Sequence, residues 1–189
     1  LFAFLKSLRE TYGAVFSLYL YYTDGTAWNL GAVTTAHRKE FQAASDWLRF
    51  GFHAHGAGSD YSVEPTANAL GHYDATIAAI RAFAGDECID RVPRSHYFAG
   101  TLATVRAWRD ATFGIRGLLS ADDDRLPYYL TAGQRDCLLA CDDLYDEVEH
   151  LYLVRTDLRL ENEVAPASML DARLGDYTNY GGQQDLICV

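Results

Sequence analysis

Histidine and aspartate side chains occur where the sequence pattern changes from apolar to polar. His53 and His55 come at the end of an apolar run, residues 47–53, that is typical of a buried strand. His96 lies in a second short run, and Asp122 follows a third. Imidazole nitrogens and carboxylate oxygens bind Zn²⁺ in proteins, and a water on such an ion is acidic enough to attack at neutral pH. The pattern predicts a metal site built from several strand ends.

The spacing of these residues suggests a role for each. Residues two apart on a strand share a face, and Gly56 allows the backbone to turn, so His53 and His55 can approach one ion. Arg94, on a strand that points into the protein, needs an anionic partner. Asp122 is the aspartate closest to its strand and is the candidate for an inward carboxylate. Asp124, before Pro127, is expected to be a solvated turn residue.

The elements that must position these residues alternate along the chain. Helices are predicted from apolar spacing, caps and stop signals at 1–12, 34–45, 64–84, from 101, at 133–149 and as a turn at 168–174. Strands are predicted at 15–22, 47–53, 94–98, 114–120, 128–130 and 151–156. Repeated strand and helix units favour parallel strands with helices outside them. In a barrel of this kind the active site lies at the carboxyl ends of the strands.

Composition limits the partners of the chain. Its 189 residues, 49% of them apolar, suit one domain over residues 1–189, and a net charge of −10 excludes nucleic acid and anionic membranes as partners. No apolar run is long enough to cross a membrane. The chain begins without Met and in mid-pattern, so we expect further residues before Leu1.

The four cysteines, Cys88, Cys137, Cys141 and Cys188, are expected to be buried thiols. Unpaired thiols favour a reducing compartment, which predicts a cytoplasmic location, or secretion if a leader has been removed. Cys137 and Cys141 also have the spacing of half a zinc site, although no second pair accompanies them.

The order of these features resembles the polysaccharide deacetylase (NodB-like) family. Residues 4–19, Phe-Leu-Lys-Ser-Leu-Arg-Glu-Thr-Tyr-Gly-Ala-Val-Phe-Ser-Leu-Tyr, are similar to the family's helix and strand that follow a first, aspartate-bearing strand. The resemblance therefore implies an irregular (β/α) barrel of about seven parallel strands with outer helices. Its first strand would precede Leu1, which makes the domain incomplete at its N-terminus.

Three family motifs have counterparts in the chain. The pair His53 and His55 resembles His-[Ser/Thr]-x-x-His with a shorter spacing. Residues 94–97, Arg-Ser-His-Tyr, resemble Arg-x-Pro-Tyr-Gly with His96 in place of proline, so His96 can supply the ligand that the shorter spacing loses. Asp122 and Asp123 resemble the Asp-rich strand end, whereas the family's Leu-x-His motif has no counterpart.

The resemblance implies hydrolysis of an N- or O-acetyl group on a sugar or polysaccharide. His53, His55 and His96 would hold a divalent metal, zinc or else cobalt or nickel, while Arg94 and Asp122 would orient the catalytic base. Tyr97, through its backbone N–H, and Asp123 would contact the substrate. The implied partner is a carbohydrate.

Two other interpretations remain open from the sequence. The altered second motif and the missing Leu-x-His motif are also compatible with an inactive barrel that binds carbohydrate or another protein. Paired carboxylates such as Asp122 could instead cleave a glycosidic bond without a metal.

Overall fold

The computed structural model describes residues 1–156. Its elements are α1 (Phe2–Tyr12), β1 (Phe16–Tyr21), η1 (Leu30–Ala32), α2 (Arg38–Ala43), β2 (Leu48–Ala54), α3 (Thr66–Phe83), η2 (Asp86–Cys88), η3 (His96–Phe98), α4 (Leu102–Asp110), β3 (Gly117–Ser120), α5 (Ala132–Cys141), β4 (Asp143–Asp146) and β5 (Leu151–Arg155). The helical turn expected at 168–174, and Cys188, lie outside the described residues. Among residues 1–156, every helix is too short or too polar to span a bilayer.

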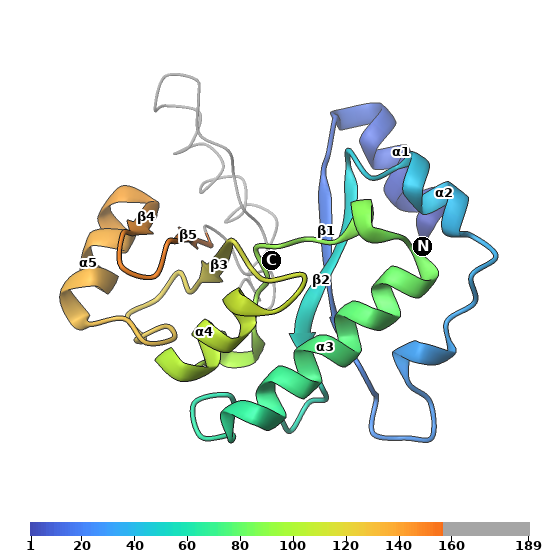
Figure 1. Ribbon diagram of the computed structural model, residues 1–189. Helices are drawn as coiled ribbons and strands as arrows, with labels where there is room; N and C mark the ends of the chain where they lie inside the picture. Colours follow the sequence, from blue (N-terminus) through green and yellow to red (C-terminus); the bar gives the residue numbers. More distant parts are fainter. Residues whose placement is uncertain (157–189) are drawn as a thin grey trace.

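The strands form two small sheets (Figure 1). In the first, β1 and β2 are parallel; in the second, the order is β3-β5-β4, with β3 parallel and β4 antiparallel to β5. The prediction of a barrel of about seven parallel strands is therefore wrong. The described residues form five strands in two sheets and no closed barrel. The alternation of helix and strand holds only in part, because α3 is followed by α4 and β4 by β5 without an element of the other kind between them.

The two sheets are joined by residues 89–94, called here the linking segment. On one side it follows β2, since Ile89 forms a parallel bridge with Phe50 and the Asp90 N–H donates to the Phe50 carbonyl at 2.8 Å. On the other side its carbonyls accept from residues at and before β3: Arg116 N–H to Arg91 at 2.7 Å and Leu119 N–H to Pro93 at 3.0 Å. The segment thus runs between β2 and β3.

The linking segment is not a regular strand because two of its residues have no backbone N–H free to pair with a neighbouring strand. The Val92 N–H donates to the Asp90 carboxylate at 2.8 Å, and Pro93 has no N–H. The strand expected at 94–98 is absent for a related reason, because Tyr97 and Phe98 have left-handed φ angles of 59° and 54°.

The predicted helix 133–149 ends at Cys141. Asp142 follows it with φ 68°, in the left-handed region, and the chain then reverses into β4. The short strand expected at 128–130 is a turn in the structure. Once the left-handed Asp142 has ended the helix, the backbone groups of residues 143–146 find their hydrogen-bond partners by antiparallel pairing with β5.

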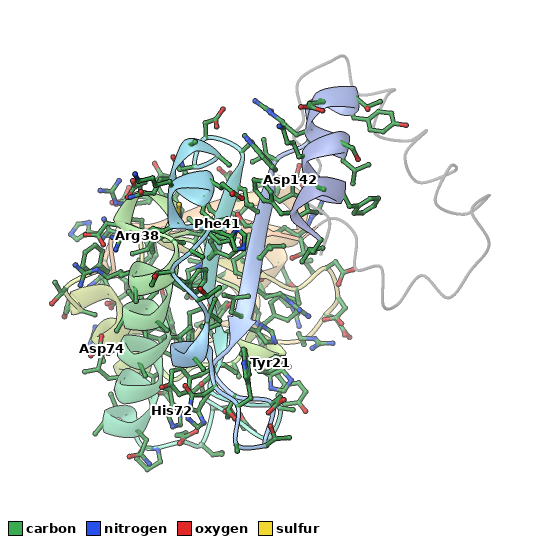
Figure 2. The ribbon with its side chains drawn as sticks, turned by 90° about the vertical axis from the view of Figure 1, so that its right-hand side faces the viewer. Tyr21, Arg38, Phe41, His72, Asp74 and Asp142 are labelled. Atoms are coloured by element: carbon green, nitrogen blue, oxygen red, sulfur yellow. The ribbon has the colours of Figure 1, made fainter. Side chains whose placement is uncertain are left out.

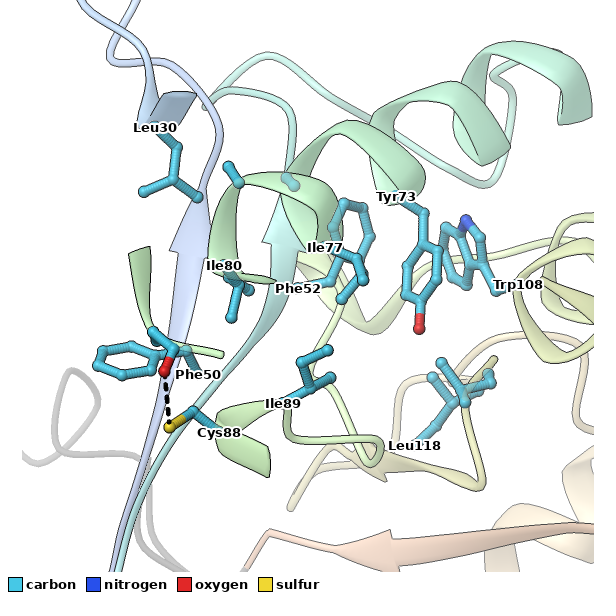
Figure 3. Close-up of a cluster of buried hydrophobic side chains, with 14 of the residues drawn as sticks. Leu30, Phe50, Phe52, Tyr73, Ile77, Ile80, Cys88, Ile89, Trp108 and Leu118 are labelled. Atoms are coloured by element: carbon cyan, nitrogen blue, oxygen red, sulfur yellow. Dashed lines mark hydrogen bonds between the residues drawn. The ribbon is translucent and has the colours of Figure 1, made fainter. Parts of the chain in front are cut away.

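The main core lies where α3 and α4 cover β2 (Figures 1 and 3). Phe52 from β2 meets Tyr73 of α3 with ring centroids 5.3 Å apart and Trp108 of α4 at 5.4 Å. Both polar atoms in this cluster are satisfied, since the Trp108 indole N–H donates to the Ala69 carbonyl at 3.0 Å and the Tyr73 hydroxyl to the Phe113 carbonyl at 2.6 Å. These contacts fix β2 and therefore the position of its carboxyl end.

Replacing Phe52 by Ala should lower the free energy of unfolding by about 3–5 kcal/mol, because Phe52 is fully buried and its removal leaves a cavity. Urea titration followed by circular dichroism measures the change. Phe4→Ala is the control: its side chain is 61% exposed, so the expected loss is below about 0.5 kcal/mol. Similar losses in both variants would contradict the assignment of the core.

Candidate functional site

The carboxyl ends of β1, β2 and the linking segment lie at one edge of the molecule. The register between β1 and β2 shifts there: Leu20 pairs with Phe52, but Tyr21 pairs with Ala54. His53 is therefore the extra residue of a β-bulge, a feature that re-aims side chains and often occurs next to active sites. Figure 2 shows Tyr21 at the arrowhead end of β1, which marks this edge.

His53 and His96, called here the histidine pair, meet at this edge. Their ring centroids lie 5.2 Å apart. Tyr21 presents its ring edge-on to both, with centroid distances of 4.7 Å to His53 and 5.6 Å to His96. The structure therefore brings together two of the three histidines that the sequence nominated as ligands.

Hydrogen bonds determine which nitrogen of each imidazole carries the proton. His53 Nδ1–H donates to the Arg94 carbonyl at 2.7 Å, and His96 Nδ1–H donates to the Ser59 carbonyl at 3.2 Å. A carbonyl can only accept, so the neutral form of each ring has its lone pair on Nε2. Histidines that bind metals are typically oriented by such a bond from the second nitrogen.

His53 is buried and stays neutral at ordinary pH. Burial is the main reason that its pKa falls from 6.5 to about 4, and the positive charges of Arg94 and His96 lower it further, against the opposing hydrogen bond to the Arg94 carbonyl. With this pKa only about 0.1% of the ring is protonated at pH 7, which is poorly suited to acid–base catalysis there. A neutral imidazole is, however, the form that binds a metal.

Tyr97 forms an exposed aromatic surface beside the pair. Its ring stacks on His96 with centroids 3.9 Å apart, and 57% of the residue is exposed. Left-handed backbone at a bulky residue is rare and costs energy, and such positions cluster at functional sites. The following residue, Phe98, is buried and lies under the guanidinium of Arg94, 4.8 Å from ring centroid to Cζ.

His55 belongs to a different cluster. It stacks between Tyr22, at 5.4 Å, and His72 of α3, at 4.3 Å. The prediction that His55 shares an ion with His53 depended on a backbone turn at Gly56 that would bring both rings to one site. The bulge at His53 and the end of β2 at Ala54 instead direct His55 toward Tyr22 and His72. His72, expected on the surface, is half-buried, and burial followed by the charge of His55 lowers its pKa.

The acidic residues after β3 have separate environments. Asp122 is half-buried two residues beyond the strand. Asp123 was expected to contact the substrate, but in the structure its carboxylate forms an ion pair with Arg125 at 2.7 Å. Within residues 1–156 no group of three or more His, Cys, Asp or Glu is arranged to hold a metal. Asp60 is the carboxylate on which the charge of His96 acts, but its Oδ1 already accepts from the Ser62 hydroxyl and N–H.

Sequence reasoning missed Tyr21 as a part of the site. It was counted as one residue of a continuous apolar strand, although it is the last residue of β1 and lies two positions before the polar turn that begins at Thr23. An aromatic residue at the carboxyl end of a parallel strand is the signal that could have identified it.

The low pKa of His53 predicts a pH-dependent stability. Because the unfolded chain binds a proton near pH 6.5 and the folded chain only near pH 4, stability falls as the pH drops through this window. Between pH 7 and pH 4, the metal-free wild type should lose about 3 kcal/mol more than His53→Gln. Urea titrations in chelator measure this. His37→Gln changes an exposed ring and should lose as much stability as the wild type. Equal losses of stability in the wild type and His53→Gln would contradict the low pKa assigned to His53.

Comparison with known proteins gives this chain no relative: no protein-family model, no curated protein and no solved structure matches it. The assignment of a function therefore depends on the geometry of the site.

Proposed function

We propose that the chain is a metal-dependent hydrolase that removes an acyl group, such as N- or O-acetyl, from a carbohydrate. The observation that carries this proposal is the histidine pair: two rings 5.2 Å apart, each with Nδ1–H bonded to a backbone carbonyl, so that Nε2 is the nitrogen available to a metal. This arrangement supports a role as ligands rather than as acid or base.

The residues fit the histidine part of a zinc-type site. Catalytic zinc ions commonly have three protein ligands and one water, and His53 and His96 would provide two nitrogens. Asp60 is one carboxylate that interacts electrostatically with His96. Cobalt or nickel would suit the same nitrogen ligands. A bound ion would polarise the acyl carbonyl and acidify a water.

The remaining residues of the site would bind and orient the substrate. Tyr21 and Tyr97 are 37% and 57% exposed beside the histidine pair, and aromatic faces with polar edges suit a sugar ring. Arg94 acts through its carbonyl, which holds the His53 ring in one orientation. Its positive charge also helps to keep His53 deprotonated.

A second candidate is a carbohydrate-binding domain without catalysis. The specific observation in its favour is that residues 1–156 do not form a group of three metal ligands. The same tyrosines would then bind the sugar, and the histidine pair would serve only to support Tyr97.

The two candidates differ in metal content. The purified chain, loaded with Zn²⁺ and desalted, should retain about one ion, and His53→Ala and His96→Ala should each lose most of it, because each removes one of the few ligands. Elemental analysis measures the ratio. His55→Ala is the matched control and should keep the ion, because that ring stacks with Tyr22 and His72 instead.

Release of acetate from acetylated sugars by the metal-loaded wild type, absent in His53→Ala, would support the hydrolase. Retention of zinc by both His53→Ala and His96→Ala, or no binding of Zn²⁺, Co²⁺ or Ni²⁺ by the wild type, would exclude it. Sugar binding that persists without metal would then favour the second candidate.

A further inference from the structure

Helix α5 carries two exposed thiols on one face. Cys137 and Cys141 are four residues apart and both are exposed, so the expectation that they are buried was wrong. Leu138 is the residue of this helix that enters the core, with 1% exposure.

The two thiols interact with each other. The pKa of Cys141 is raised, first by a hydrogen bond with the Cys137 side chain, then by the charge of Cys137, and also by Asp142 and Asp143. A thiol with a raised pKa is a weak nucleophile near neutral pH. Cys141 is therefore unlike an activated catalytic cysteine.

A disulfide between these residues would distort the helix. Side chains four residues apart on a helix have Cβ atoms about 5–6 Å apart, whereas a disulfide requires about 3.5–4.5 Å. A single atom that bonds both sulfurs spans a greater distance, because each bond of a soft metal to sulfur adds about 2.3 Å. The geometry thus favours a bridging atom over a direct sulfur–sulfur bond.

We propose that Cys137 and Cys141 form a dithiol site for soft, thiophilic trivalent arsenic centres. Thiolate ligands select such soft centres over hard cations. With phenylarsine oxide, the arsenic–oxygen bond breaks, two arsenic–sulfur bonds form, and the two thiol protons leave with the oxygen as water. No atom changes its oxidation state, so no oxidant is needed.

The surrounding charge favours neutral or cationic ligands. Asp142 and Asp143 act electrostatically on Cys141, and Asp136 lies next to Cys137 in the sequence. Asp136 pairs with Arg135 at 2.7 Å and Asp142 pairs with Arg155, so part of this charge is compensated. An anionic thiol such as glutathione would be repelled, whereas a neutral arsenical would not.

Titration of the full chain with phenylarsine oxide tests the proposal, because this probe binds thiol pairs and not imidazoles. One equivalent should bind and protect two thiols from Ellman's reagent. Cys137→Ser and Cys141→Ser should each weaken binding about 100-fold or more. The arsenical can then bond only one sulfur, and the high effective concentration of the second thiol no longer contributes to its affinity. Circular dichroism should show unchanged folding, since both side chains are exposed.

Two further variants serve as controls. Cys188→Ser and His53→Ala should bind the arsenical as the wild type does, which separates this site from the proposed metal site at the histidine pair. Wild-type affinity in either Cys137→Ser or Cys141→Ser, or loss of binding in Cys188→Ser, would overturn the proposal. The result is independent of whether the chain is a hydrolase.

Discussion

The backbone hydrogen bonds of the linking segment are the constraint on which the sheets and the site both depend. Its carbonyls and its Asp90 N–H connect β2 to β3, while the N–H of Val92 is bonded to a side chain and Pro93 has none. The segment can therefore join two sheets but cannot extend either as a regular strand. Its last residue, Arg94, offers the carbonyl that fixes the His53 ring. The irregularity that prevents one continuous sheet also positions the candidate ligand.

A tyrosine ties the first sheet to the same segment. The ring of Tyr19 lies so close to Gly51 that a Cβ there would be 2.7 Å from its Cδ1, which explains the glycine in the middle of β2. The ring thereby reaches over β2, and its hydroxyl donates to the Val92 carbonyl at 3.1 Å. Burial, followed by the charge of Asp90, raises the Tyr19 pKa, so the hydroxyl remains a donor. One face of β2 thus carries the core residue Phe52 and the other carries His53.

Local patterns predicted most elements correctly. Helical spacing and caps gave α1, α3 and α4, and the Thr101 side chain accepts the Thr104 N–H as an N-cap should. Apolar runs gave β1, β2, β3 and β5. The errors, strands at 94–98 and 128–130 and a helix continued to 149, occurred where left-handed residues interrupt the chain at Tyr97, Tyr128 and Asp142. Such angles are imposed by contacts distant in sequence, so a local pattern could not reveal them.

The sequence by itself determined which residues could do chemistry and where most helices and strands lie, because spacing and residue type are local properties. Only the tertiary structure decided how these residues are grouped. It placed His96 beside His53, moved His55 to another cluster through one bulge, and added Tyr21. It also decided that the strands form two sheets rather than a barrel, because hydrogen bonding between distant segments, not the order of elements, sets which strands pair.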